Sequence, residues 1–167
     1  MYNVNMTKTS VLTIHELSSF VYEASNSTFA SADLSKLTKE NDHSTTLTYK
    51  KGHWSYNDNY FGGEPYGGRE VVFYKKKPYW MMVYYGTVSD KYPDIKGLYA
   101  FLQEALRRGT LTFPWRGPKL FKKGTFTYTF NIFGSVERFT AIEVIKSGKM
   151  IVYTANFAGG LVDQRKE

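Results

Sequence analysis

The sequence predicts an α+β protein with a single domain, built mostly from antiparallel strands together with two main helices. Two segments place apolar residues at helical spacing, and several others are dense in aromatic and β-branched residues, as strands are. The 167 residues include 14 Tyr, 12 Phe and 3 Trp, which is enough apolar surface for a sizeable core. Wholesale disorder is therefore excluded.

The first helix is predicted over about residues 14–25. Apolar residues from Leu17 to Ala24 recur at helical spacing there. Thr13 and Glu16 have the spacing of a capping box. We therefore expect the helix to begin just after Thr13.

The remaining elements are predicted from local composition and from the Gly and Pro residues that separate them. Residues 26–46, rich in Ser, Thr, Asn and Asp, predict an irregular connection. A second helix is expected from about Ile95 to Arg108, with Gly109 just past its end. Strands are expected near residues 45–50, 53–61, 69–75, 79–88, 110–113, 125–133, 139–146 and 149–157.

An internal repeat organises these elements. Residues 49–62 match residues 121–134 at 7 of 14 positions, and the helices and later strands match in similar register. This predicts one domain, residues 1–167, made of two similar halves at about 12–88 and 95–161. Two such halves can bury their apolar faces against each other. The groove between them is then either a ligand site or packed core.

Positions at which the copies differ are the candidate site. Asp58 stands where the second copy has Phe130, and the turn at 62–68 is richer in glycine than its counterpart. Alternating strand positions share one face, so aromatic side chains flank Asp58 there. They predict a pocket for a cationic or hydrogen-bonding ligand. The candidate ligand-binding residues are Trp54, Tyr56, Asp58, Tyr60, Glu64, Arg69 and Trp80.

A purely structural interpretation of the same residues stays open. The glycines can serve a hairpin that needs positive φ angles. Asp58 can pair with Arg69, and the aromatic residues can be ordinary sheet packing. Glu70 and Glu143 match between the copies, which favours a structural role for both, such as pairing with a basic residue.

Signals for catalysis are few. The chain has three His and no Cys, with no histidine pair at metal-ligand spacing. We therefore expect no metal, no cofactor and no catalytic triad. One enzymatic alternative remains, a hydrolase in which Asp58 and Glu64 act as an acid/base pair.

The charge is uneven along the chain. The net charge is +7, with −2 over residues 1–48 and +9 over residues 49–167. The basic residues form short clusters, which are typical of solvated turns and helix ends. The alternative is a basic face that binds nucleic acid, with aromatic residues that stack on bases.

The termini and hydropathy give no sign of a membrane. No stretch approaches the ~18 apolar residues of a membrane span, and the first residues lack the pattern of a signal peptide. We therefore expect a soluble, cytoplasmic protein with no membrane partner. The oligomeric state is not indicated.

A family resemblance is carried by several short segments. They are Tyr56–Gly62, Gly67–Val71, Pro78–Met82 with Tyr85–Gly86, Arg116–Pro118 and Ala158–Val162. Together they resemble a family of uncharacterised bacterial and archaeal domains. That family often follows a helix-turn-helix in proteins described as transcriptional regulators, and no catalytic or ligand residues are established for it.

The resemblance implies a sensor or interaction module. The first predicted helix is already part of the repeat, so we expect no DNA-reading element. The leading hypothesis is a non-enzymatic module that binds a small molecule or a protein. Nucleic-acid binding and the Asp58/Glu64 hydrolase are the alternatives.

Overall fold

A computed structural model describes residues 9–31 and 37–165, with side chains from residue 14 onward. The elements of this part, in chain order, are α1 (Thr9–Ser27), the 3-10 helix η1 (Phe29–Ser31), β1 (Leu37–Lys39), β2 (Thr45–Lys51), β3 (Trp54–Gly62), β4 (Tyr66–Tyr74), β5 (Lys77–Val88), α2 (Ile95–Leu106), β6 (Leu120–Lys123), β7 (Phe126–Ser135), β8 (Arg138–Ser147) and β9 (Met150–Leu161).

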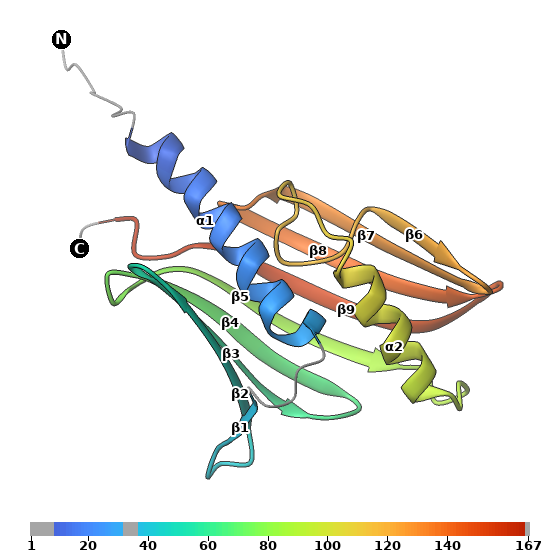
Figure 1. The fold of residues 1–167 in the computed structure, drawn as a ribbon. Coiled ribbons are helices and arrows are strands. Elements are labelled where there is room, and N and C mark those ends of the chain that lie inside the picture. Colours follow the sequence, from blue (N-terminus) through green and yellow to red (C-terminus); the bar gives the residue numbers. More distant parts are fainter. Residues whose placement is uncertain (1–8, 32–36, 166–167) are drawn as a thin grey trace.

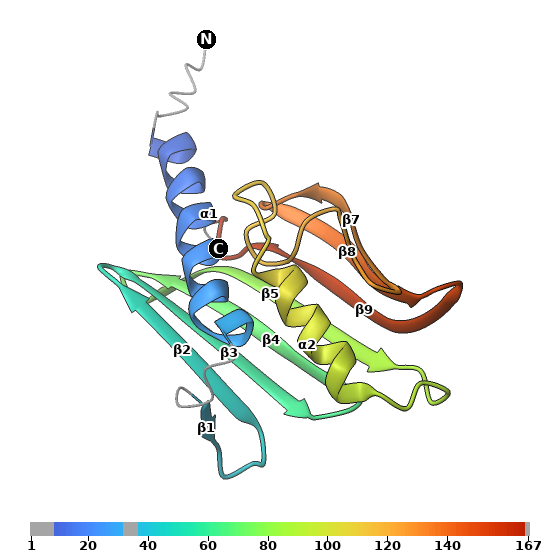
Figure 2. The ribbon, with the colours of Figure 1, turned by 45° about the vertical axis from the view of Figure 1, so that its right-hand side comes forward.

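The described strands form one antiparallel sheet. Their order is β1-β2-β3-β4-β5-β9-β8-β7-β6, so β5 and β9 pair at its centre. The sheet curls, and α1 and α2 both lie on its concave side (Figures 1 and 2). The predicted α+β class, with mostly antiparallel sheet and two helices, is confirmed.

The element order is similar in the two halves, except that η1 and β1 lie between α1 and β2 in the first half. A helix is followed by four antiparallel strands, β2 to β5 after α1 and β6 to β9 after α2. The halves meet edge to edge through β5 and β9, not face to face as expected. The buried apolar residues of both halves form one core, and the helices of both halves lie on the same concave side of the sheet (Figure 2). The internal duplication itself stays a prediction.

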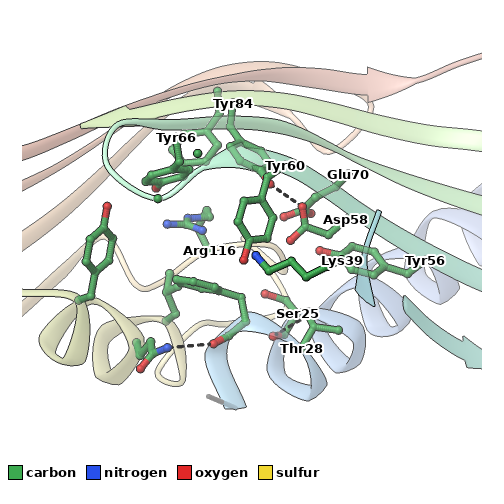
Figure 3. Close-up of a pocket in the computed structure, with 17 residues that line it drawn as sticks. Ser25, Thr28, Lys39, Tyr56, Asp58, Tyr60, Tyr66, Glu70, Tyr84 and Arg116 are labelled. Carbon is green, nitrogen blue, oxygen red and sulfur yellow. Dashed lines mark hydrogen bonds between the residues drawn. The ribbon is translucent and has the colours of Figure 1, made fainter. Parts of the chain in front are cut away.

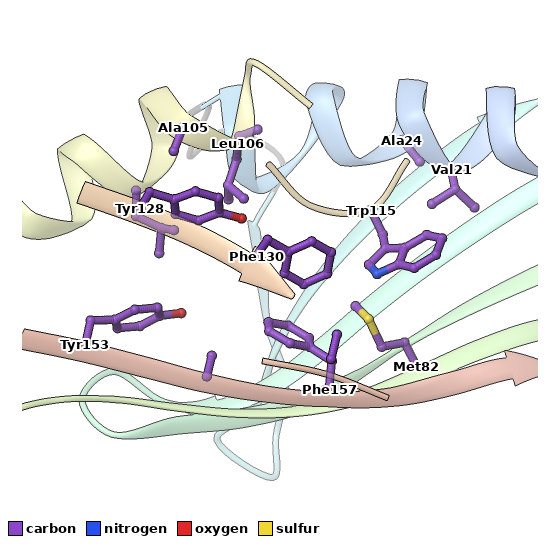
Figure 4. Packing of buried hydrophobic residues seen from close by; sticks show 14 of the residues in the cluster. Val21, Ala24, Met82, Ala105, Leu106, Trp115, Tyr128, Phe130, Tyr153 and Phe157 are labelled. Atoms are coloured by element: carbon purple, nitrogen blue, oxygen red, sulfur yellow. The ribbon is translucent and has the colours of Figure 1, made fainter. Parts of the chain in front are cut away.

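The core fills the space between the helices and the concave face. The apolar stripes that predicted the helices are buried, including Leu17 and Val21 of α1 and Leu98 and Leu102 of α2. Figure 4 shows Trp115, which follows α2, between α1 and the sheet. Trp115 stacks on Phe139 with ring centroids 4.5 Å apart. The segment between α2 and β6 is thereby anchored in the core, close to the concave face.

Three local expectations were wrong. Helix α1 begins at Thr9, so Thr13 lies inside it and does not cap it; the side chain of Thr13 is outside the described part. Residues 110–113 form a turn with an isolated bridge between Thr110 and Phe113, not a strand. The short β1 lies within the predicted irregular connection, because pairing with β2 supplies its order.

Candidate functional site

A pocket lies on the concave side of the sheet, between its first half and the ends of both helices. Its volume is about 320 Å³, at the lower end of the range for small-ligand pockets. Residues of β3, β4 and β5 line one side, and residues of α1, η1 and α2 line the other (Figure 3). The polar lining residues are Ser25, Thr28, Lys39, Tyr56, Asp58, Tyr60, Tyr66, Glu70, Tyr84, Tyr99, Gln103 and Arg116.

Asp58 and Glu70, here called the acidic pair, are buried in this lining. They are direct cross-strand partners in β3 and β4, so their side chains share a face. Their exposed fractions are 5% and 6%. Tyr84 donates a hydrogen bond to Asp58 Oδ1, but Glu70 Oε2 has no hydrogen-bond partner among the described residues. A buried polar atom without a partner is unfavourable, so a ligand donor that reached it would remove that cost.

The surroundings raise both carboxyl pKa values. Burial raises the pKa of Asp58 to about 6, opposed by the hydrogen bond from Tyr84 and the charge of Arg116. Burial, followed by repulsion from Asp58, raises the pKa of Glu70 to about 8, opposed by Arg116 and Tyr56. Because the two groups interact, these values describe the pair as a whole. The acidic pair therefore holds a proton more readily than two separate, solvated carboxyls do.

Glycine in β4 allows a tyrosine to reach Asp58. Gly68 lies opposite Tyr84 of β5 and Tyr60 of β3. A Cβ at Gly68 would lie 2.7 Å from the Tyr84 hydroxyl oxygen and 2.4 Å from the carbonyl oxygen of Asn59. The missing side chain therefore leaves the Tyr84 ring room to cross β4. The glycine-rich turn helps to shape the pocket in this way.

A buried ion pair lies beside the acidic pair. Arg116 Nε donates to Glu143 Oε2 at 2.9 Å, and its Nη2 donates to Oε1. Tyr128 and Tyr153 also donate to this carboxylate. The Glu143 side chain is fully buried and that of Arg116 is 9% exposed. The guanidinium also lies over the Phe157 ring, 4.9 Å from its centroid. Glu143 is thus fully partnered, as the sequence interpretation expected.

The two halves differ at this matched glutamate position. Glu143 of β8 lies opposite Phe130 of β7, whereas Glu70 of β4 lies opposite Asp58 of β3. The first half thus carries two carboxyls where the second carries one. No salt bridge joins either member of the acidic pair to a basic residue in the described chain.

The comparisons with known proteins place this site within a family. A model of the family described as a domain of unknown function (DUF5680) matches residues 58–162. The chain belongs to this family. No curated protein and no solved structure matches it.

The DUF5680 match begins at Asp58 and includes both members of the acidic pair. It also includes Arg116 and Glu143. Lining residues contributed by α1 and β1, such as Ser25 and Lys39, precede it. The charged centre of the pocket therefore comes from the family's own segment, and part of the wall comes from outside it.

The structure brings together three of the residues predicted for the site. Tyr56, Asp58 and Tyr60 line the pocket. Glu64 lies beside it and accepts hydrogen bonds from the Tyr99 hydroxyl, the Thr87 hydroxyl and the Val88 amide. Glu64 therefore fastens the β3–β4 turn to β5 and α2.

The other three predicted residues lie elsewhere. Trp54 stacks on Phe20 and packs against Tyr74. Arg69 is exposed and lies next to Glu70 in β4, so it points to the opposite face and does not pair with Asp58. Trp80 is fully buried and donates from Nε1 to the carbonyl of Val136.

Sequence reasoning missed the pocket role of Glu70, Tyr84 and Arg116. Because Glu70 and Glu143 match between the two copies, the sequence favours a structural role for both. The sequence does not show that their neighbours in the sheet differ. The alternation that put Tyr56 and Asp58 on one face, applied across the β4–β5 hairpin, would have indicated Tyr84. Arg116 lies in an irregular segment and gave no periodic signal.

Basic residues do not collect at one end of the sheet. The basic β2–β3 and β4–β5 turns lie at one end, and the β6–β7 and β8–β9 turns at the other (Figure 1). Lys51 and Lys123 form ion pairs with helix glutamates. Among the described residues, no cluster of three His, Asp or Glu suits a metal ion. None of the described helices is long and apolar enough to span a membrane.

Proposed function

We propose that the chain is a non-enzymatic binding module that holds a small ligand in the pocket beside the acidic pair. The observation that carries this proposal is the unpartnered Glu70 Oε2, buried in the lining of a cavity of about 320 Å³. A ligand donor at this point satisfies the carboxyl, and the tyrosine walls supply apolar contact.

The position of the acidic pair supports this proposal further. Burial of the two neighbouring carboxyls disfavours the folded state, because it removes their charged forms from water and, for Glu70, adds repulsion from Asp58. Glu143 shows that a glutamate at the matched position can be satisfied by the chain itself. The pocket therefore contains a polar site that the described chain leaves incomplete.

The hydrolase alternative receives less support. It joins Asp58 to Glu64, but Glu64 already accepts three hydrogen bonds that hold the turn against β5 and α2. The carboxyl that faces Asp58 is Glu70. Binding without chemistry is the simpler use of such a pair.

The module's role is proposed from the family resemblance and from the location of its basic turns. In our proposal it acts as the ligand-sensing part of a cytoplasmic bacterial regulator, with DNA contacted by another segment or chain. The mixed location of the basic turns supports this division. A mobility-shift assay against random duplex DNA at low salt tests it: absence of binding is expected, and tight, salt-dependent binding would contradict it.

A thermal-shift screen tests the binding function. A ligand that binds only the folded state stabilises it by about 2.7 kcal/mol at a hundredfold excess over its Kd. We expect small-molecule hits whose shifts disappear in Asp58→Asn and Tyr60→Ala. Tyr85→Ala is the matched control, because Tyr85 is exposed on the opposite face.

Two outcomes would contradict the proposal. One is a screen of metabolites without a hit. The other is a set of hits that survive both pocket substitutions as well as they survive Tyr85→Ala. Melting temperatures of the unliganded variants show in the same experiment whether each one is folded.

A further inference from the structure

The buried ion pair of the second half shows how this fold accommodates a guanidinium group. Arg116 binds Glu143 through two nitrogens and lies over the Phe157 ring. Planar guanidinium groups favour this combination of a two-point carboxylate contact and an aromatic surface. The second half thus supplies its own cation to the glutamate of β8.

The first half presents similar surroundings without that cation. Glu70 occupies the matched position in β4, with Oε2 unpartnered. Asp58 beside it adds a second carboxyl. Tyr60 and Tyr84 also line the pocket, and Figure 3 shows both rings beside the acidic pair. Carboxylates and aromatic faces are together the usual partners of an organic cation.

Two cations also line the pocket, and neither forms a salt bridge with the acidic pair in the described chain. The guanidinium of Arg116 donates to Glu143, and Lys39 Nζ donates to Thr45 Oγ1 at 2.6 Å. Arg116 is paired with Glu143, and Lys39 is exposed. Among the described lining residues, the buried atom without a hydrogen-bond partner is an acceptor, Glu70 Oε2, which favours a ligand that donates.

We propose that the pocket binds its ligand through a guanidinium group, which donates to Glu70 Oε2 and to the Asp58 carboxylate and lies against the tyrosine walls. This inference rests on the binding function proposed above and names the chemical class of the ligand. The pocket volume suits a small guanidinium compound or the end of an arginine-like side chain.

Isothermal titration calorimetry with three probes of similar shape tests this inference. The probes are butylguanidinium, neutral butylurea and anionic pentanoate. We expect butylguanidinium to bind at least about tenfold more tightly than the other two, because only it brings a positive charge to the acidic pair. Glu70→Gln should weaken its binding at least about tenfold. Glu16→Gln, at an exposed position of α1, should leave it unchanged.

A pH series with the unaltered protein keeps the inference testable if Glu70→Gln does not fold. The groups around Glu70 are Asp58 and Tyr56 of β3, Tyr84 of β5, Arg116, and Lys39 of β1 at the pocket. Asp58 and Glu70 are the carboxyls of this group, and burial raises their pKa values to about 6 and about 8, so the pair becomes more negative as pH rises past these values. Butylguanidinium should therefore bind more tightly as pH rises through this range, with release of a proton.

The contrary results are distinct from failure of the binding function. Equal or tighter binding of butylurea, preference for pentanoate, absence of butylguanidinium binding, or affinity independent of pH and of Glu70→Gln would each overturn the guanidinium assignment. Hits from the metabolite screen that depend on Tyr60 would still support a ligand pocket. If the metabolite screen also gave no such hits, the proposed binding function itself would be contradicted.

Discussion

Glu70 and Glu143 are the same residue type at matched strand positions, and they differ in their neighbours. Glu143 receives hydrogen bonds from one arginine and two tyrosines. Glu70 faces a second carboxyl and keeps one oxygen unpartnered. The local environment, and not the residue type, therefore gives one glutamate a full set of partners and leaves an oxygen of the other without one.

The raised pKa of Glu70 links stability to pH. The unfolded chain loses this proton near the ordinary pKa of 4.5, whereas the folded chain holds it up to about pH 8. The folded state thus binds more protons in between, so the free energy of unfolding falls as pH rises across this window. Asp58 adds to the fall between its ordinary pKa of 3.8 and about 6.

Glu70→Gln should remove most of this pH dependence. Relative to the parent protein, we expect the variant to gain stability at about pH 8.5 compared with about pH 5, by on the order of a few kcal/mol. Urea unfolding at the two pH values measures the difference. Parallel pH profiles for the two proteins would show that Glu70 is not the group responsible.

The buried ion pair gives a second prediction at the residue scale. Arg116→Met leaves Glu143 buried without its cation and should cost about 3–5 kcal/mol. Arg108→Met makes the same substitution at a pair with Glu104 in which the arginine side chain is 55% exposed. It should cost less than about 1 kcal/mol. Chemical denaturation of both variants compares them, and similar losses would contradict the account.

At the scale of elements, β3, β4 and β5 position the acidic pair and the tyrosines that surround it. The strands are in register, so Gly68 lies between Tyr60 and Tyr84. Gly68→Ala would push its Cβ against both neighbours and should cost about 1–3 kcal/mol. Gly63→Ala is the matched control, because a Cβ there meets no atom within 4 Å.

The two alanine variants should also differ in binding. Displacement of Tyr84 by Gly68→Ala removes the hydrogen bond to Asp58, so pocket ligands should bind more weakly. Gly63→Ala should leave the melting temperature close to that of the parent, whereas its affinity reports a methyl group added to the pocket wall. Thermal melts with and without a ligand test both expectations. If Gly68→Ala kept the melting temperature and affinity of Gly63→Ala, the position of the Tyr84 ring across β4 would be unimportant.

Helices and strands could be predicted from the sequence better than the pairing between strands could. Apolar spacing identified the buried faces of α1 and α2, and β-branched and aromatic runs identified most of the strands. The start of α1 was wrong because Thr13 matches a capping motif inside the helix. The face shared by Tyr56, Asp58 and Tyr60 follows from alternation alone. The partnership of Asp58 with Glu70 depends on the register between strands, which local patterns do not fix.

At the scale of the whole molecule, the pairing of β5 with β9 joins the halves into one sheet. Helices α1 and α2 contribute to one continuous core, and both line the pocket. The segment after α2 brings Arg116 to a pocket formed mainly by the first half. The site therefore depends on both halves, although its acidic pair lies in one.

This continuity predicts a single cooperative unfolding transition. Trp54 lies in the first half, whereas Trp80 and Trp115 lie in contact in the shared core. Tryptophan fluorescence and far-ultraviolet circular dichroism should give coincident urea transitions. Two separated transitions would indicate that the halves unfold independently and would contradict a shared core.

Carbon-13 NMR titration of the side-chain carboxyls tests the central claim most directly, because it observes the acidic pair itself. We predict that the acidic pair titrates in two steps in the free protein, near pH 6 and near pH 8, and that both midpoints fall when butylguanidinium is added. Midpoints at the ordinary values in the free protein would mean that the pair is solvated or already neutralised. That result would contradict an incomplete buried site.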